Sequence, residues 1–228
     1  MSRILIIQTG SVESEISARY GNYSAWFLDA LPDGHQRCTI IRPFDGEALP
    51  AADALADYAG VLLTGSRLSV RAEQPWMAPL GHWAVQAAAH KPVLGVCFGH
   101  QLIGEALGGR VEKNPEGLEA GTISVTLTDA GRADPLFEGM PWDIAVQSSH
   151  TDVLVVPPPG AVRLAGNRNT TWQAYAWGPR LRAVQFHPEL RPEICRDIFA
   201  SRGWEVPVTA SEHGRQILER WDRNWVRG

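Results

Sequence analysis

The chain has 228 residues, of which 44% are hydrophobic and 20% charged, as in an ordinary globular protein. Its formal net charge of −4 lacks the basic footprint that nucleic-acid binding requires, so we expect no nucleic-acid partner. The cysteines are odd in number and widely spaced, which indicates neither a disulfide framework nor a metal site and favours a reducing cytoplasm: Cys38, Cys97 and Cys195.

The first half of the chain alternates between strand-like and helix-like patterns. Short apolar runs predict strands at Ile4–Gln8, Cys38–Arg42, Gly60–Thr64 and Pro92–Val96. Helical spacing between these runs covers about Tyr23–Leu31, Leu49–Tyr58 and Pro75–His90. The first apolar run is too short for a signal peptide or a membrane span, so no membrane attachment is expected. The alternation predicts a parallel, doubly wound sheet with helices on both faces.

The second half of the chain has a different pattern. Short β-rich segments separated by Gly and Pro lie between Gly109 and Val184, at Thr122–Leu127, Ile144–Gln147 and Ala161–Ala165. We interpret them as antiparallel strands added at the sheet edge. The tail from Thr209 to Val226 predicts a helix, with Thr209 or Ser211 as its N-cap and an apolar face at Ile217, Leu218, Trp221 and Trp225. No linker, repeat or low-complexity stretch divides the sequence, so a single domain over residues 1–228 is expected.

A candidate nucleophile lies in the middle of the chain. The apolar run Pro92–Val96 ends at Cys97, and Gly99–Leu107 has the pattern of a helix, so Cys97 falls on the sharp turn between strand and helix. Such an elbow pushes a nucleophile out of the sheet edge, and the glycines on either side leave room for strained backbone and for substrate. The free N–H groups of the following helix favour a thiolate there. Because free cysteines are often packing residues, Cys97 alone does not establish a catalytic site.

A candidate base lies downstream of this cysteine. The strand-like run Leu181–Phe186 leads into His187-Pro188-Glu189. Residues i and i+2 of an extended segment point the same way, so Glu189 can fix the tautomer of His187 and stabilise its imidazolium. His100 is closer to Cys97 in sequence, but a side chain on the first helical turn is expected to point away from the elbow.

These two segments carry a family resemblance. Gly95-Val96-Cys97-Phe98-Gly99-His100-Gln101 and Phe186-His187-Pro188-Glu189, with Cys97 and His187 90 positions apart, resemble the motifs of the class I, triad-type glutamine amidotransferases. Leu62–Val70 is similar to the strand and glycine-rich oxyanion loop of that family, and Gln147–Asp152 to its Ser-His segment. The likeness runs from Ile4 to about Phe199, and stand-alone GMP synthase-like members are the most similar.

The resemblance implies a flavodoxin-like fold and thioester chemistry on glutamine. Cys97 would attack the side-chain carboxamide, His187 would accept the thiol proton and deliver one to the departing ammonia, and Glu189 would orient His187. Water would then release glutamate. The resemblance implies no metal and no cofactor.

The remaining site residues follow from the same resemblance. The backbone N–H groups of Gly65 and Phe98 would form the oxyanion hole, although Ser66-Arg67 stands where Gly-Pro is common in the family. The side chain of Gln101 and the backbone of Ser149, His150 and Thr151 would hold the α-amino and α-carboxylate groups of the substrate. We interpret Arg67 and Arg71, which follow the oxyanion loop, as solvated charges, with contact to an acidic substrate tail as the alternative.

Three functional interpretations stay open. The first is a glutaminase subunit that supplies ammonia to a separate synthase, since the sequence contains no phosphate-binding loop of its own. The second is a self-sufficient γ-glutamyl hydrolase or peptidase with the same thioester chemistry and a different leaving group. The third is a catalytically silent regulatory or binding protein of the same fold, against which the complete set of Cys97, His187 and Glu189 argues. The sequence gives no indication of the oligomeric state.

Overall fold

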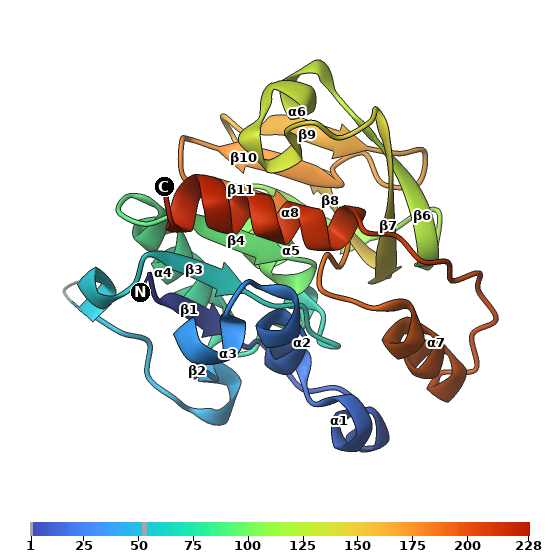
Figure 1. The fold of residues 1–228 in the computed structure, drawn as a ribbon, viewed down its shortest axis with the longest axis horizontal. Coiled ribbons are helices and arrows are strands. Elements are labelled where there is room, and N and C mark those ends of the chain that lie inside the picture. Colours follow the sequence, from blue (N-terminus) through green and yellow to red (C-terminus); the bar gives the residue numbers. More distant parts are fainter. Residues whose placement is uncertain (1, 52–53) are drawn as a thin grey trace.

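The computed structural model describes residues 2–51 and 54–228 (Figure 1). Its strands are β1 Ile4–Ile7, β2 Cys38–Ile41, β3 Gly60–Leu63, β4 Val93–Val96, β5 Arg110–Lys113, β6 Glu119–Leu127, β7 Asp143–His150, β8 Asp152–Val156, β9 Val162–Gly166, β10 Ala174–Trp177 and β11 Leu181–Val184. Its α-helices are α1 Ser14–Tyr20, α2 Tyr23–Ala30, α3 Gly34–Arg37, α4 Met77–Ala88, α5 Phe98–Ala106, α6 Asp129–Ala133, α7 Pro192–Ser201 and α8 His213–Trp221.

One large sheet organises the described part of the chain. Its strand order is β2-β1-β3-β4-β11-β10-β9-β6-β7, and β5 pairs with β8 in a separate two-stranded ribbon. In this order, the first five strands, β2, β1, β3, β4 and β11, run parallel to one another. The remaining strands, β10, β9, β6 and β7, continue the sheet in antiparallel fashion. The predicted flavodoxin-like, doubly wound and mostly parallel sheet with antiparallel edge strands is therefore confirmed.

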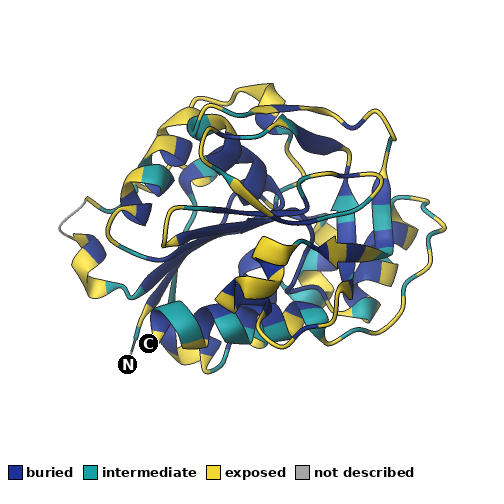
Figure 2. Cartoon of the chain, turned by 90° about the horizontal axis from the view of Figure 1, so that it is seen from above, coloured by how far each residue is buried: buried dark blue, intermediate teal, exposed yellow. Residues whose placement is uncertain are grey.

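Helices cover both faces of the parallel strands, which Figure 2 shows as buried between them. Alternate residues of β1 point to opposite faces because side chains alternate along a strand. Ile4 and Ile6 pack in one core with residues of α2 and α8, whereas Leu5 and Ile7 pack in a second core with residues of α4 and α5. Each strand at the centre of the sheet is thus buried on both faces, which explains its continuous apolar run.

A third apolar cluster lies beyond the carboxyl ends of the parallel strands. It joins α1 and the first part of α2 to α7 through Ile16, Trp26, Ile198 and Phe199. The sequence reasoning did not single out α1 or α7 as helices. Their packing matters for function because it brings the segments around Glu13 and Arg202 next to the sheet edge.

The predicted helix at Leu49–Tyr58 is wrong over the residues that the structure describes. Only a short 3-10 turn, Ala54–Asp57, forms there, and positions 52 and 53 lie outside the described residues. Pro50 explains the difference: its carbonyl accepts a hydrogen bond from the Trp83 indole at 2.9 Å, which ties the segment to α4.

The C-terminal helix forms as predicted, and Trp221 is fully buried in the core. It begins later than expected, at His213, and continues into a π-helical turn at Asp222–Val226. The N-cap is Glu212, so the prediction of Thr209 or Ser211 at that position is wrong, although the Ser211 hydroxyl just before it accepts the backbone N–H of His213 at 3.2 Å. None of the helices in residues 2–51 and 54–228 has the length and hydropathy of a membrane span.

Candidate active site

Three neighbouring parallel strands place the main candidate residues at one edge of the sheet. In the register, Leu63 of β3 lies beside Gly95 of β4, and Val96 lies beside Val184 of β11. Gly65, Cys97 and His187 follow within three residues of these strand ends. Because the carboxyl ends of adjacent parallel strands share an edge, the topology alone brings the three together.

Cys97 occupies a strained elbow between β4 and α5. Its backbone has φ 49° and ψ −100°, a left-handed conformation that is rare for a residue with a side chain. A methyl group added to Gly99 would lie 2.8 Å from the Leu63 carbonyl oxygen, and one added to Gly95 would lie 2.9 Å from the backbone of Gly99. The two glycines thus allow the close backbone approach on which this sharp turn depends.

His187 and Glu189 form a buried pair beside the cysteine. The imidazole Nδ1 lies 2.7 Å from Glu189 Oε1, as their i, i+2 spacing predicts. Burial opposes the imidazolium, but the charges of Glu189 and Cys97 outweigh it and raise the pKa of His187 to about 10. The backbone N–H of His187 also donates to the Gln147 carbonyl at 2.8 Å, so β7 helps to hold this residue in place.

Gly65 lies close to both of these side chains. A methyl group added to it would lie 2.6 Å from His187 Cε1 and 3.6 Å from Cys97 Cβ. The Thr64 carbonyl accepts the Gly99 N–H at 3.2 Å and the Thr9 hydroxyl at 3.1 Å. In a trans peptide the N–H points opposite to the carbonyl, so the Gly65 N–H is directed away from these donors. Phe98 begins α5, and the N–H of a first helical residue has no partner within the helix.

The departure at Ser66-Arg67 is accommodated by local bonding. The Ser66 hydroxyl accepts the Leu68 N–H at 3.1 Å, and Gly10, which lacks a side chain, leaves room for that hydroxyl. The Gly65 carbonyl lies within 2.9 Å of the hydroxyls of both Thr9 and Thr64. The loop is thus held on both sides of Gly65.

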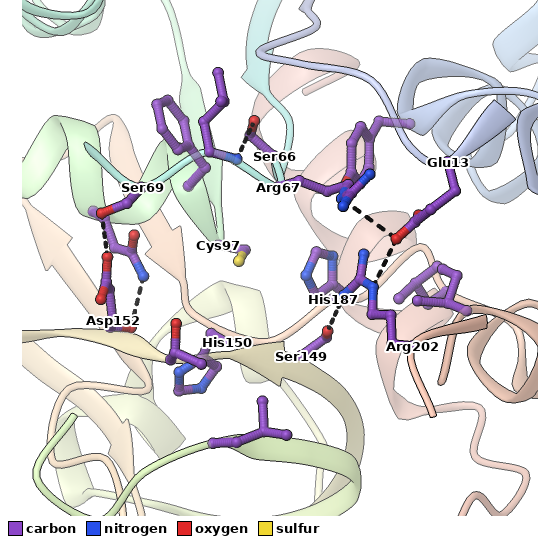
Figure 3. A pocket seen from close by; sticks show the side chains of 18 of the residues that line it. Glu13, Ser66, Arg67, Ser69, Cys97, Ser149, His150, Asp152, His187 and Arg202 are labelled. Carbon is purple, nitrogen blue, oxygen red and sulfur yellow. Dashed lines mark hydrogen bonds and ion pairs between the residues drawn. The ribbon is translucent and has the colours of Figure 1, made fainter. Parts of the chain in front are cut away.

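A cavity of about 580 Å³ opens at Cys97 and His187, and a close view of it is given in Figure 3. The predicted substrate residues Gln101, Ser149, His150 and Thr151 all line it. Gln101 is buried, and its Nε2 donates to the Asp152 carbonyl at 2.8 Å. The structure therefore brings Cys97, His187 and the four predicted substrate residues to one cavity, whereas Glu189 is bonded to His187 but does not line that cavity.

His150 belongs to a second buried network behind the cavity wall. Its Nε2 lies 3.0 Å from Glu119 Oε2, and the two residues face each other across β6 and β7. The Glu119 carboxylate also accepts hydrogen bonds from the side chains of Asn167, Thr170 and Gln173 at 2.7 to 2.8 Å. The His150 imidazole is thus paired with the Glu119 carboxylate.

Several residues that line the cavity were not predicted as site residues from the sequence, among them Glu13, Asp152, Arg202 and Trp204. Asp152 accepts hydrogen bonds from the side chains of Ser69 and Arg71, the latter at 3.2 Å. Arg67, interpreted from the sequence as a solvated charge, lines the cavity and lies 3.3 Å from Glu13. No local sequence pattern marks these residues, because they come from segments far apart in the chain.

The other histidine and cysteines considered from the sequence, His100, Cys38 and Cys195, are packing residues outside the cavity. His100 is fully buried, and its ring lies 4.8 Å from the ring of Tyr175. Burial lowers the pKa of His100 to about 3, so it stays neutral, and its ring packs against Tyr175 and does not line the cavity. Cys195 is buried and Cys38 is half-buried; burial raises the pKa of both thiols, to about 11 for Cys38.

The fold and this edge of the sheet define an α/β protein with a cysteine and a histidine at one cavity and a glutamate bonded to that histidine. The family model of the class I glutamine amidotransferases matches residues 29–201, and the chain belongs to that family.

The chain is similar to known proteins over most of its length. It is 28% identical over 200 residues to γ-glutamyl peptidase 5 of Arabidopsis thaliana, covering 86% of this chain and 79% of that protein. It is 35% identical over 164 residues to a subunit of the glutamine-hydrolyzing GMP synthase of Halobacterium salinarum, covering 68% of this chain and 82% of that protein. The crystal structure of a glutamine amido transferase from Methylobacillus flagellatus has the same fold, with a TM-score of 0.79, 22% identity, and coverage of 99% and 96% of the two chains.

Proposed function

We propose that this protein is a cysteine-dependent amidase that hydrolyses the γ-carboxamide of glutamine or of a related γ-glutamyl amide. The observation that carries the proposal is the position of His187, 2.7 Å from Glu189 and next to Cys97 on its strained elbow. Membership of the class I glutamine amidotransferase family and the γ-glutamyl peptidase relatives support an amidohydrolase. Residues 1–228 would act as one catalytic domain.

The reaction begins with Cys97 as a thiolate and His187 as an imidazolium. The thiolate attacks the γ-carbonyl carbon, and the oxyanion that forms is held by the N–H groups of Gly65 and Phe98. As the C–N bond breaks, His187 gives its proton to the departing nitrogen. The products of this half are ammonia or an amine and a glutamyl thioester on Cys97.

Water completes the cycle. Neutral His187 takes a proton from water while the hydroxide adds to the thioester carbon, again with Gly65 and Phe98 on the oxyanion. Collapse of this intermediate expels the Cys97 thiolate and releases glutamate. Glu189 holds the imidazole through both halves and stabilises its charged form.

Gln101 and the backbone of residues 149–151 are proposed to hold the α-amino and α-carboxylate groups. Asp152 lines the same wall and adds a carboxylate that suits an α-ammonium group. These contacts would select a free α-amino acid end and leave the γ-amide at Cys97.

The test is release of glutamate from glutamine and from a panel of γ-glutamyl amides. Turnover is expected for at least one of them and should fall at least about 1000-fold in Cys97→Ala. A glutamine-like alkylating agent should label Cys97 and protect it from later modification. Equal glutamate release by Cys97→Ala, or no turnover together with no labelling of Cys97, would show the proposal to be wrong.

A second candidate is a γ-glutamyl peptidase, favoured by the size of the cavity and by relatives such as γ-glutamyl peptidase 5. A cavity of about 580 Å³ is in the range of sites that enclose drug-sized ligands, so it has room for more than glutamine. The third candidate is an ammonia-supplying subunit with a separate synthase, which the relationship to the GMP synthase subunit of Halobacterium salinarum supports. Co-purification of a synthase with the protein would favour the subunit.

A further inference from the structure

A cluster of two arginines and one glutamate lies in the active-site cavity. Glu13 Oε1 lies 2.9 Å from Arg202 Nε and 3.3 Å from Arg67 Nε. These residues come from the start of α1, the oxyanion loop and the end of α7, and all three line the cavity (Figure 3). Arg202 is further held by Ser149, whose hydroxyl accepts from its Nη1 at 3.2 Å, and by the Trp204 ring, 5.1 Å from its Cζ.

The cluster carries an uncompensated positive charge. Burial alone would raise the pKa of Glu13, but the hydrogen bond from Arg202 and the charges of both arginines hold it below its ordinary value, so Glu13 is ionised. Two guanidinium groups therefore face one carboxylate. Within the described residues, Arg67 Nη1 and Nη2 and Arg202 Nη2 have no protein acceptor. The cluster can accept a further carboxylate, which guanidinium groups bind with charge-assisted hydrogen bonds.

The position of the cluster identifies the part of the substrate that would meet it. In Figure 3, Glu13, Arg67 and Arg202 lie on the same side of Cys97 as His187, whereas Ser69 and Asp152 lie on the opposite side. In the mechanism proposed above, the departing nitrogen has to be next to His187, which protonates it, and the glutamyl end is proposed to occupy the side of Gln101 and Asp152. The cluster is thus placed to contact the amine that leaves.

We propose that Arg67 and Arg202 select γ-glutamyl amides whose leaving amine carries a carboxylate, such as γ-glutamyl amino acids and short γ-glutamyl peptides. The inference rests on the thioester mechanism proposed above and names its substrate class. The Cys97 Sγ–carbon bond forms, the amide C–N bond breaks, and the proton of His187 goes to the nitrogen. The amino acid or peptide then departs with its carboxylate released from the two arginines.

The test compares γ-glutamylglycine with γ-glutamylglycinamide, which differ in the charge at the far end of the leaving group. The measured quantity is the ratio of their kcat/KM values for glutamate release, which does not depend on the fraction of folded enzyme. In the unaltered protein the ratio should favour γ-glutamylglycine by about 10- to 100-fold, as expected for charge-assisted hydrogen bonds to one carboxylate. Arg202→Gln and Arg67→Gln should each bring the ratio toward one.

Arg196→Gln is the matched control. Arg196 is an exposed arginine of α7 that bonds the Val208 carbonyl at 3.0 Å and lies outside the cavity, so the ratio should stay as in the unaltered protein. Equal kcat/KM values for the two compounds in the unaltered protein would overturn the inference and leave the amidase proposal intact. So would a ratio that survives both arginine substitutions. Absence of any turnover with no labelling of Cys97 would overturn both.

Discussion

Two buried histidines line the same cavity, and each is paired with a buried carboxylate at a similar distance. His187 and Glu189 are 2.7 Å apart, His150 and Glu119 are 3.0 Å apart, and all four side chains are at most 5% exposed. Only the first pair has a thiol next to it. The comparison teaches that burial and a carboxylate partner do not by themselves distinguish the proposed base, His187, from His150; the neighbouring thiol does.

The two carboxylates differ in how their charge is used. Glu119 accepts from Asn167, Thr170 and Gln173 as well as facing His150, so its charge is shared among several fixed donors. Glu189 bonds His187 through Oε1, and its Oε2 has no protein partner among the described residues. The charge of Glu189 is thus directed at the imidazole, while that of Glu119 joins β6 and β7 to the segment 167–173.

Among changes to the two pairs, the largest expected effect is that of Glu189→Gln, which keeps the shape of the side chain and removes its charge. The pKa of His187, about 10 in the intact pair, should fall toward the ordinary value of 6.5 because the stabilising anion is lost. We expect kcat to drop by at least about 100-fold. The alkaline limb of the kcat/KM profile should move to lower pH, since His187 gives up its proton earlier.

The same pH profile, measured for Glu119→Gln, is the control for this prediction. Its alkaline limb should coincide with that of the unaltered protein, because Glu119 faces His150 and not the base. A limb that stays in place in Glu189→Gln, or that moves equally in both variants, would remove the distinction between the two pairs.

Glu119→Gln should instead affect stability. Burial raises the pKa of Glu119, but the hydrogen bonds from His150, Asn167 and Thr170 more than offset this and hold the pKa below 4.5. The charged carboxylate therefore stabilises the fold above about pH 4.5, and this contribution is lost as pH falls through the lower folded value. We expect the variant to lose about 2–4 kcal/mol of unfolding free energy near pH 7 in urea denaturation.

The difference in stability between Glu119→Gln and the unaltered protein should shrink in acid. Glu116→Gln is the matched control, because Glu116 is exposed in the same turn region, and it should change stability by less than about 0.5 kcal/mol. A loss for Glu119→Gln no larger than that of Glu116→Gln would mean that the second network does not stabilise the fold.

The same comparison explains how much of the site could be predicted from the sequence. Glu189 was found because it lies only two residues from His187. Residues 188–189 form a turn and not the extended segment that was expected, but the short spacing still lets the two side chains meet. Glu119 and His150 are paired by the register of β6 and β7, which no local pattern specifies. The Glu13–Arg67–Arg202 cluster depends on the packing of α1 against α7, so it could not be predicted from the sequence either.

The fold was predictable to a similar degree. Continuous apolar runs marked β1, β3 and β4 because these strands are buried on both faces. The helix α7 escaped notice because its apolar residues face a small satellite cluster rather than the main core. The helix expected at 49–58 fails over the described residues, since the tertiary bond from Trp83 to Pro50 overrides local helical spacing.

The smallest expected effect concerns the backbone conformation of Cys97, the residue beside His187. His150 lies on a regular strand, whereas the cysteine beside His187 has φ 49°. Cys97→Gly and Cys97→Ala both remove the thiol, but only glycine adopts a positive φ without a steric penalty. We expect Cys97→Gly to be more stable than Cys97→Ala by about 0.5–1 kcal/mol in urea denaturation, even though glycine costs more chain entropy on folding.

Ala145→Gly should change the stability in the opposite direction. Ala145 lies in the regular part of β7, where glycine brings only the entropy cost, so this variant should be less stable than the unaltered protein by about 0.5–1 kcal/mol. If Cys97→Gly proved less stable than Cys97→Ala, the elbow would carry no strain that glycine relieves. The position of Cys97 at the sheet edge would then follow from strand topology alone, and the conformation of the turn would have no energetic part in presenting the proposed nucleophile.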